Sequence, residues 1–181
     1  RAPSGSNRQK FRFLVLRDGP KARAAKSLLG ESFRAGWNEK RSNDGYDAGS
    51  GVADDSPKAR MARTMQHFVD HFEDTPVVML ACLVRYRPEN YAEGASVFPA
   101  VQNLMLACRA EGLGCVLTTL LCYQEAAIKG LLAIPDDWGT CAHIPIGYPV
   151  LKGHGPITRR PIEKLVFQDA WGQAMTNKGH S

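Results

Sequence analysis

Residues 76–84 read Pro-Val-Val-Met-Leu-Ala-Cys-Leu-Val, and this uninterrupted apolar run decides the fold. It has the length of a strand, and because no polar residue alternates with the apolar ones, we predict a strand that is buried on both faces. The residues before it, 57–73, predict a helix that begins at Pro57. Its large apolar residues recur at spacings of four and three, which places them on one face: Met61, Met65, Phe68 and Phe72.

A second helix is predicted after the strand, at residues 96–111. Ser96 is placed to cap its first turn, Pro99 falls inside that turn, and Gly112 suits a left-handed residue just beyond the last one. Apolar side chains cover most sides of this helix: Val97, Val101, Leu104, Met105, Leu106, Ala107 and Cys108. A helix of this kind is buried, so we predict a central core or interface helix.

The remaining segments alternate between strands and helices. We predict strands at 10–17, 114–119 and 141–146, and helices at 21–29 and 123–133. Asn, Asp, Gly and Ser dominate residues 36–57, which predicts a mobile surface loop. The alternation favours an α/β or α+β sheet with helices packed on it.

Size and composition restrict the class of protein. The 181 residues fit one domain, which we place at residues 1–171, with a tail at residues 172–181. The net charge of +5 is spread along the chain and not gathered into a basic patch, so we predict no nucleic-acid partner. No apolar run reaches the roughly 18 residues that span a bilayer, and no signal-peptide pattern opens the sequence. We therefore predict a soluble cytoplasmic protein without a membrane partner.

Cysteine and histidine usage argues against a metal site. Four of the five cysteines lie in strongly apolar segments and no pair has CxxC spacing, which favours buried, reduced thiols. His67 and His71 have the spacing of a zinc pair on a helix, but no third ligand is evident nearby. We predict that no metal is bound.

Four short segments carry residue types that suit a ligand. Residues 2–9 (Ala-Pro-Ser-Gly-Ser-Asn-Arg-Gln) offer small residues and hydrogen-bonding side chains before a strand. Residues 112–119 (Gly-Leu-Gly-Cys-Val-Leu-Thr-Thr) end a strand on two threonines. Residues 144–149 (Ile-Pro-Ile-Gly-Tyr-Pro) end another strand, and residues 158–163 (Thr-Arg-Arg-Pro-Ile-Glu) hold adjacent arginines that suit a phosphate. Taken singly, each could be an ordinary turn, a strand end or a solvated basic pair.

The order and spacing of these segments together resemble the nitroreductase family. The resemblance also includes the helix with Gln102, Asn103 and Ala107, and it covers nearly the whole chain apart from residues 36–57. It implies an α+β sandwich around a mainly antiparallel sheet flanked by helices, and an obligate homodimer that binds FMN at its interface. It also implies that Ser4, Gly5 and Asn7 contact the flavin from one subunit.

Further cofactor contacts follow from the same resemblance. Leu117, Thr118 and Thr119 would line the flavin from the other side, with a backbone N–H, that of Thr119 foremost, donating to the flavin N5. Arg159 aligns with the family's phosphate-binding arginine, and Arg160 is a second candidate. Family members also carry a first helix and an arginine-rich segment before the Ala-Pro-Ser motif, whereas this sequence begins at Arg1. We expect weaker FMN binding by a chain without that segment.

The resemblance predicts an FMN-dependent oxidoreductase. NADH or NADPH would reduce the flavin, and a nitroaromatic, quinone or related small acceptor would then be reduced in a ping-pong cycle. No side chain is needed as a catalytic nucleophile. Ser6, Trp37 and Tyr46 are the predicted substrate contacts, the last two within a lid at residues 36–57. A reductive dehalogenase, another specialised flavoenzyme of the family and a non-catalytic flavin-binding protein remain alternatives.

Overall fold

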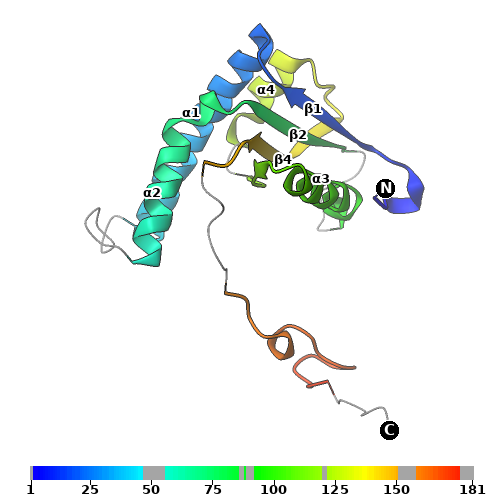
Figure 1. The fold of residues 1–181 in the computed structure, drawn as a ribbon. Helices are drawn as coiled ribbons and strands as arrows, with labels where there is room; N and C mark the ends of the chain where they lie inside the picture. Colours follow the sequence, from blue (N-terminus) through cyan, green and yellow to red (C-terminus); the bar gives the residue numbers. More distant parts are fainter. Residues whose placement is uncertain are drawn as a thin grey trace. The chain divides into compact units, whose positions relative to one another are not determined.

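A computed structural model describes residues 2–46, 56–85, 88, 92–119, 122–150 and 158–175. The chain divides into two compact units, at residues 1–148 and 149–181. The first unit contains the whole sheet and four α-helices (Figure 1). The described part of the second unit has one short 3-10 helix, η5 (Ile162–Lys164), and a contact between the rings of Phe167 and Trp171.

The sheet has four strands in the order β1-β2-β4-β3, and all its pairings are antiparallel. The strands are β1 (Phe11–Leu16), β2 (Val77–Val84), β3 (Gly114–Cys115) and β4 (Trp138–Gly147). The apolar run of residues 76–84 becomes β2, a central strand between β1 and β4. Successive side chains of a strand point to opposite faces, so Leu80 enters one core and Ala81 the other. The predicted burial of this strand on both faces is confirmed.

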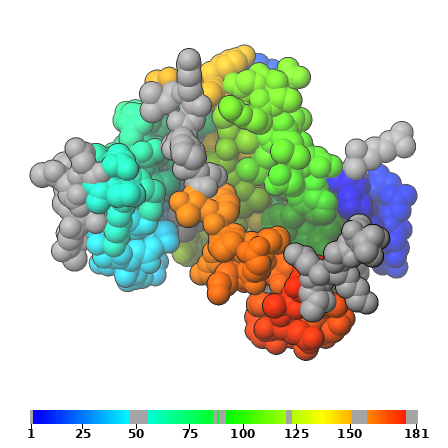
Figure 2. Space-filling view, turned by 60° about the horizontal axis from the view of Figure 1, so that its bottom comes forward, coloured from blue at the N-terminus to red at the C-terminus, as the bar shows by residue number. Residues whose placement is uncertain are grey.

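Helices cover both faces of the sheet, which gives the predicted α+β sandwich. One face packs on α1 (Pro20–Asn43), α2 (Pro57–Asp70) and α4 (Glu125–Leu132), and the other packs on α3 (Phe98–Ala110). In Figure 2 the green surface of α3 lies next to the blue N-terminal loop, and the cyan helix pair lies on the opposite side of the view. None of the helices in the described part of the chain is both long and apolar enough to cross a bilayer.

The prediction for residues 36–57 is wrong over its first part. Helix α1 does not end at Leu29 but continues to Asn43, and Trp37 is only 1% exposed. Leu29, Phe33 and Trp37 recur every four residues, so burial of one helical face outweighs the weak propensities of the polar residues between them. Residues 47–55 of the predicted loop lie outside the described residues.

Strand β4 contains a bulge that matters for the site. Ala81 faces Ala142 and Cys82 faces Thr140, so Cys141 is an extra residue on β4. The Cys141 thiol bonds to the carbonyl of Ala81 at 3.2 Å. The bulge shifts the register of β4 between Thr140 and the end that pairs with β3.

Candidate functional site

The loop before β1 is held in an uncommon backbone conformation. Ser6, Asn7 and Gln9 have φ values of 51°, 52° and 50°, in the left-handed region. Outside glycine this conformation costs on the order of 1 kcal/mol for each residue, although asparagine tolerates it. Such outliers gather at ligand sites, where the surrounding structure fixes them.

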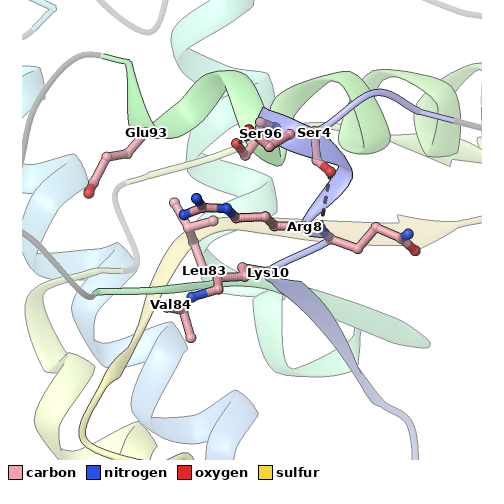
Figure 3. A pocket seen from close by; sticks show the side chains of 10 residues that line it. Ser4, Arg8, Lys10, Leu83, Val84, Glu93 and Ser96 are labelled. Atoms are coloured by element: carbon pink, nitrogen blue, oxygen red, sulfur yellow. Dashed lines mark hydrogen bonds between the residues drawn. The ribbon is translucent and has the colours of Figure 1, made fainter.

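Hydrogen bonds within the loop maintain this conformation. The backbone N–H of Asn7 donates to the Ser4 carbonyl at 2.9 Å, and the backbone N–H of Gln9 donates to the Ser4 hydroxyl at 3.0 Å. The dashed line in Figure 3 marks the second of these bonds. The Gln9 side chain donates to the Asn7 side chain at 3.2 Å. Ser4 and Asn7, two of the predicted flavin contacts, therefore also organise the loop itself.

Ser96, which lies just before α3, connects this loop to the start of that helix. Its hydroxyl accepts a hydrogen bond from the Gly5 amide at 3.2 Å, across 91 positions of the sequence. The prediction that Ser96 caps α3 is wrong, because the helix begins at Phe98 with Val97 at the N-cap position. The Ser96 hydroxyl, which would accept a hydrogen bond in a helix cap, accepts one from the Gly5 N–H instead.

A pocket of about 250 Å³ opens beside the loop (Figure 3). It is lined by Ser4, Gly5, Ser6, Arg8, Gln9, Lys10, Leu83, Val84, Glu93 and Ser96. Hydroxyls and two cationic side chains surround a small apolar patch from the end of β2, which suits a ligand with both polar and apolar parts. Four of the polar lining residues were not predicted as site residues from the sequence: Arg8, Lys10, Glu93 and Ser96. The alternation Arg8-Gln9-Lys10 beside a predicted ligand loop was the available signal for the two basic ones.

The second predicted segment lies at the other edge of the sheet. The Thr118 amide donates to the His143 carbonyl at 2.9 Å, and the His143 amide donates to the Thr118 carbonyl at 3.0 Å. In an antiparallel pair of this kind, the backbone groups of the neighbouring residues point to the opposite side. The Thr119 amide therefore points away from β4, and it has no hydrogen-bond partner among the described residues.

Apolar side chains lie open beside this amide. Val116 is 46% exposed and Leu117 is 36% exposed. An outward N–H next to exposed apolar surface can bind a flat apolar ligand that carries a hydrogen-bond acceptor at its edge. The flavin contacts that the resemblance implies for Leu117, Thr118 and Thr119 stay a prediction, and the amide of Thr118 is already used by His143.

His143 is itself buried, with 1% of its surface exposed. Burial lowers the pKa of its imidazole to about 4, against a smaller opposing effect of the Glu125 carboxylate. At neutral pH the ring is uncharged, so it holds the Thr118 segment through its backbone and adds no charge to the site.

The two candidate segments lie apart within one chain. Helix α3 begins beside Gly5, through Ser96, and its C-terminal end turns into β3, which leads to Thr118. The helix runs from Phe98 to Ala110, a length of about 20 Å at 1.5 Å per residue. The loop at 4–9 and the segment at 116–119, which follows β3, are therefore at opposite ends of α3 and at opposite edges of the sheet.

Two predicted substrate contacts, Trp37 and Tyr46, are not among the residues that line the pocket beside the loop. Trp37 lies in the core, where its indole N–H donates to the Gln66 side chain at 2.8 Å. Tyr46 packs against Trp37, with 5.5 Å between ring centroids, and the Lys58 ammonium lies 5.0 Å from the Tyr46 ring. Both rings belong to the packing of α1 and α2. Burial leaves almost none of Trp37 exposed to a substrate, and the role of Tyr46 stays a prediction. Ser6 does line the pocket beside the loop.

Arg159 and Arg160 are exposed residues of the second unit. Among the described residues, the Arg159 guanidinium makes one long contact, 3.4 Å, with the carbonyl of Thr158. Both side chains are accessible to an anion, as their predicted role requires.

Comparisons with known proteins agree with this fold. The Nitroreductase family model matches residues 1–148. A solved structure from Desulfovibrio desulfuricans, described as a nitroreductase in complex with FMN, is 25% identical, with 94% of this chain and 78% of that chain covered and a TM-score of 0.59. An FMN- and NADPH-dependent nitroreductase from Sphigopyxis sp. strain HMH is 21% identical, with 94% and 85% covered and a TM-score of 0.64. An iodotyrosine deiodinase bound to FMN and 3-iodo-L-tyrosine is 22% identical, with 93% and 80% covered and a TM-score of 0.55.

Proposed function

Because the chain belongs to the nitroreductase family, we propose that it is an FMN-dependent oxidoreductase that uses NADH or NADPH to reduce a small acceptor, such as a nitroaromatic compound or a quinone. FMN is present in the similar Desulfovibrio structure, and NADPH is the donor named for the Sphigopyxis enzyme. Bound FMN would supply the hydride chemistry, while the protein binds and orients it and excludes water. Donor and acceptor would occupy one place in turn, as in a ping-pong cycle.

This proposal rests on one observation, the outward direction of the Thr119 backbone amide. A flavin ring is flat and largely apolar, and it has a nitrogen acceptor, N5, at its edge. The exposed side chains of Val116 and Leu117 would contact the ring, and the Thr119 amide would donate to N5. A donor directed at a position that gains electron density favours the reduced cofactor.

The loop at residues 4–9 forms the second wall of the proposed site. Gly5 brings the backbone close to the ligand without a side chain, while Asn7 and Ser6 offer polar groups to the flavin edge and to the substrate. Arg8, Lys10 and Glu93 line the same pocket, and its two cationic groups against one carboxylate favour a ligand that carries negative charge. Arg159 and Arg160, in the second unit, are the residues that we propose bind a phosphate, through paired hydrogen bonds.

A homodimer would bring the two walls together. Within one chain they lie at opposite ends of α3, so each flavin would use the loop at 4–9 from one copy and residues 117–119 from its partner. Helix α3 supports this arrangement because its outward side chains include Phe98 and Leu106, which are 41% and 58% exposed. Exposed apolar side chains on a central helix favour burial against a second copy.

Flavin spectroscopy tests the proposal. The purified chain, incubated with FMN and separated from excess, should keep a flavin absorbance spectrum, and NADH or NADPH should bleach it under anaerobic conditions. Oxidation of the reduced protein by a nitroaromatic compound or a quinone should then restore the spectrum. Restoration by an iodinated phenol alone would favour the dehalogenase alternative. Stoichiometric FMN without reduction by either nucleotide would favour a non-catalytic binding protein.

A further inference from the structure

The side chain of Arg12, the second residue of β1, bonds back to the end of the loop before that strand. Its Nη1 donates to the Gln9 carbonyl at 3.0 Å and to the Phe11 carbonyl at 2.7 Å. The carbonyl of Lys10, between them, accepts a hydrogen bond from the Val84 backbone N–H at 3.3 Å. Three successive carbonyls are therefore bonded where the loop joins the sheet, and two of them have a charged donor, which forms the stronger kind of bond.

Gln9 is the residue through which the loop closes on itself. Its φ of 50° lies in the left-handed region, which is unfavourable outside glycine. Its backbone N–H donates to the Ser4 hydroxyl at 3.0 Å, and its side chain donates to the Asn7 side chain at 3.2 Å. Both bonds require Gln9 to keep this conformation, so a contact that holds its carbonyl stabilises the closed loop.

Arg12 is itself in contact with a distant strand. Its guanidinium carbon lies 5.4 Å from the centroid of the Trp138 ring, at the start of β4. A cation at this distance over an indole face is attracted to the ring. The Trp138 ring packs against the core between the sheet and α1, so Arg12 connects the loop to a well-packed part of the fold.

We propose that Arg12 is a positioning residue for the loop at residues 4–9, which it keeps closed by holding Gln9 in its left-handed conformation. The use of this loop as a wall of the flavin site rests on the proposed function. The positioning itself rests on the bonds from Arg12 to Gln9 and Phe11 and on its contact with Trp138. A wall that is ordered before the ligand arrives costs less conformational entropy on binding.

Amide hydrogen exchange of the FMN-free chain, followed by NMR, tests the proposal. The amides of Asn7 and Gln9 are suitable reporters because each donates a hydrogen bond within the loop. Arg12→Leu should speed the exchange of both amides by about fivefold, the factor that corresponds to a typical hydrogen bond. Arg12→Lys keeps the charge, but its compact ammonium cannot reach the carbonyls and cover the Trp138 ring together, so it should give a smaller increase. The matched control is Arg17→Leu, an exposed position just beyond the other end of β1, which should change neither rate.

Trp138→Leu disturbs Arg12 from the other side, without a change in the loop or in Arg12. It should speed the exchange of the Gln9 amide in the same direction as Arg12→Leu. The amides of β2, a central strand of the sheet, report on global stability in the same spectra. In Arg12→Leu their rates should stay as in the unaltered chain, because Arg12 is exposed and lies outside the buried core.

The affinity for FMN provides a second readout. Arg12→Leu should raise the dissociation constant of FMN by about fivefold, and Arg17→Leu, which removes the same charge, should not. Unchanged exchange of the Asn7 and Gln9 amides in Arg12→Leu would overturn the proposal. Equal acceleration in Arg17→Leu or in the amides of β2 would also overturn it, since charge alone or a general loss of stability would then be the cause. Failure of the unaltered chain to bind FMN would instead overturn the proposed function, and the exchange rates would still decide the role of Arg12.

Discussion

Thr118 and His143 exchange two backbone hydrogen bonds, of 2.9 and 3.0 Å, across the edge of the sheet. This pair uses the amide of Thr118 and leaves the amide of Thr119 pointing to the opposite side. Two adjacent threonines that look equivalent in the sequence therefore differ in their backbone hydrogen bonding. Thr118 attaches the segment to the sheet, and Thr119 presents a donor.

The first prediction concerns this donor. Thr119→Pro removes the N–H, and because Thr118 is already in a strand pairing, the extended backbone that precedes a proline is compatible with it. We expect the midpoint potential of bound FMN to fall by about 20–60 mV, which corresponds to about 1–3 kcal/mol for a lost hydrogen bond. Spectroelectrochemical titration measures the shift. Thr119→Ala keeps the N–H and should stay close to the unaltered protein, and an equal shift in both variants would point to the side chain instead.

The second prediction concerns Trp37, which the sequence suggested as a substrate contact. Trp37→Ala removes a large buried side chain and its bond to Gln66, so the free energy of unfolding should fall by about 3–5 kcal/mol. Urea denaturation measures the change. The same substitution at Trp171, which is 94% exposed, should change stability by less than about 0.5 kcal/mol. A raised KM for the acceptor with unchanged stability would restore the substrate role to Trp37.

The sequence was sufficient to locate β1, β2 and β4, whereas the strand predicted at 114–119 is described as β3 over Gly114–Cys115. An uninterrupted apolar run identified β2, and small polar residues before β1 identified the loop of Ser4 and Gly5. The predicted end of helix α1 came too early because Gly36 and the asparagines that follow favour a loop. The repeat from Leu29 to Trp37, however, has a helical period and is buried. There the burial of apolar side chains in the folded chain outweighs the weak helix propensity of the polar residues.

Contacts between distant residues could not be predicted. Ser96 has the composition and place of a helix cap, but its hydroxyl is used by Gly5, 91 positions away. Glu125 is an ordinary acidic residue for the first turn of a helix, and only the folded chain brings Thr140 and Arg85 to its carboxylate. The candidate site therefore depends on pairings that no local pattern encodes.

The third prediction is a pH dependence of stability that arises from His143. Its pKa is about 4 in the folded chain and about 6.5 in the unfolded chain, so between these values the unfolded state binds a proton that the folded state does not. The contribution of the uncharged His143 to the free energy of unfolding is complete above about pH 6.5. As the pH falls toward 4, this contribution is lost, which lowers the free energy of unfolding by about 3 kcal/mol in all. Denaturant unfolding from pH 4 to pH 8 measures this slope.

Two variants identify the source of that slope. His143→Gln should flatten the dependence between pH 4 and 6.5, whatever its effect on stability at pH 8. His67→Gln, at an exposed position on α2, should retain it. The lowered pKa of Glu125 acts in a more acidic window, below about pH 4.5, where its stabilising carboxylate becomes protonated. A slope that survives His143→Gln would mean that another group titrates there.

The last prediction concerns the apolar outer face of α3. If this face joins two copies, Leu106→Glu places a charge in the interface, where burial without a partner costs several kcal/mol. We expect the unaltered protein to sediment as a dimer and the variant as a monomer. The variant should also lose FMN, since the loop at residues 4–9 and the amide of Thr119 would then belong to separate molecules. Sedimentation velocity with detection at both the protein and the flavin absorbance measures both effects together.

Val15→Glu is the matched control for this substitution. Val15 is 54% exposed and Leu106 is 58% exposed, so the two changes add the same charge at equally accessible apolar positions. Val15 lies on the edge strand β1, not on α3. The control should remain dimeric and keep its FMN. If Leu106→Glu stayed dimeric with bound FMN, the interface would lie elsewhere, and the two walls of the flavin site would have to meet by a surface other than α3.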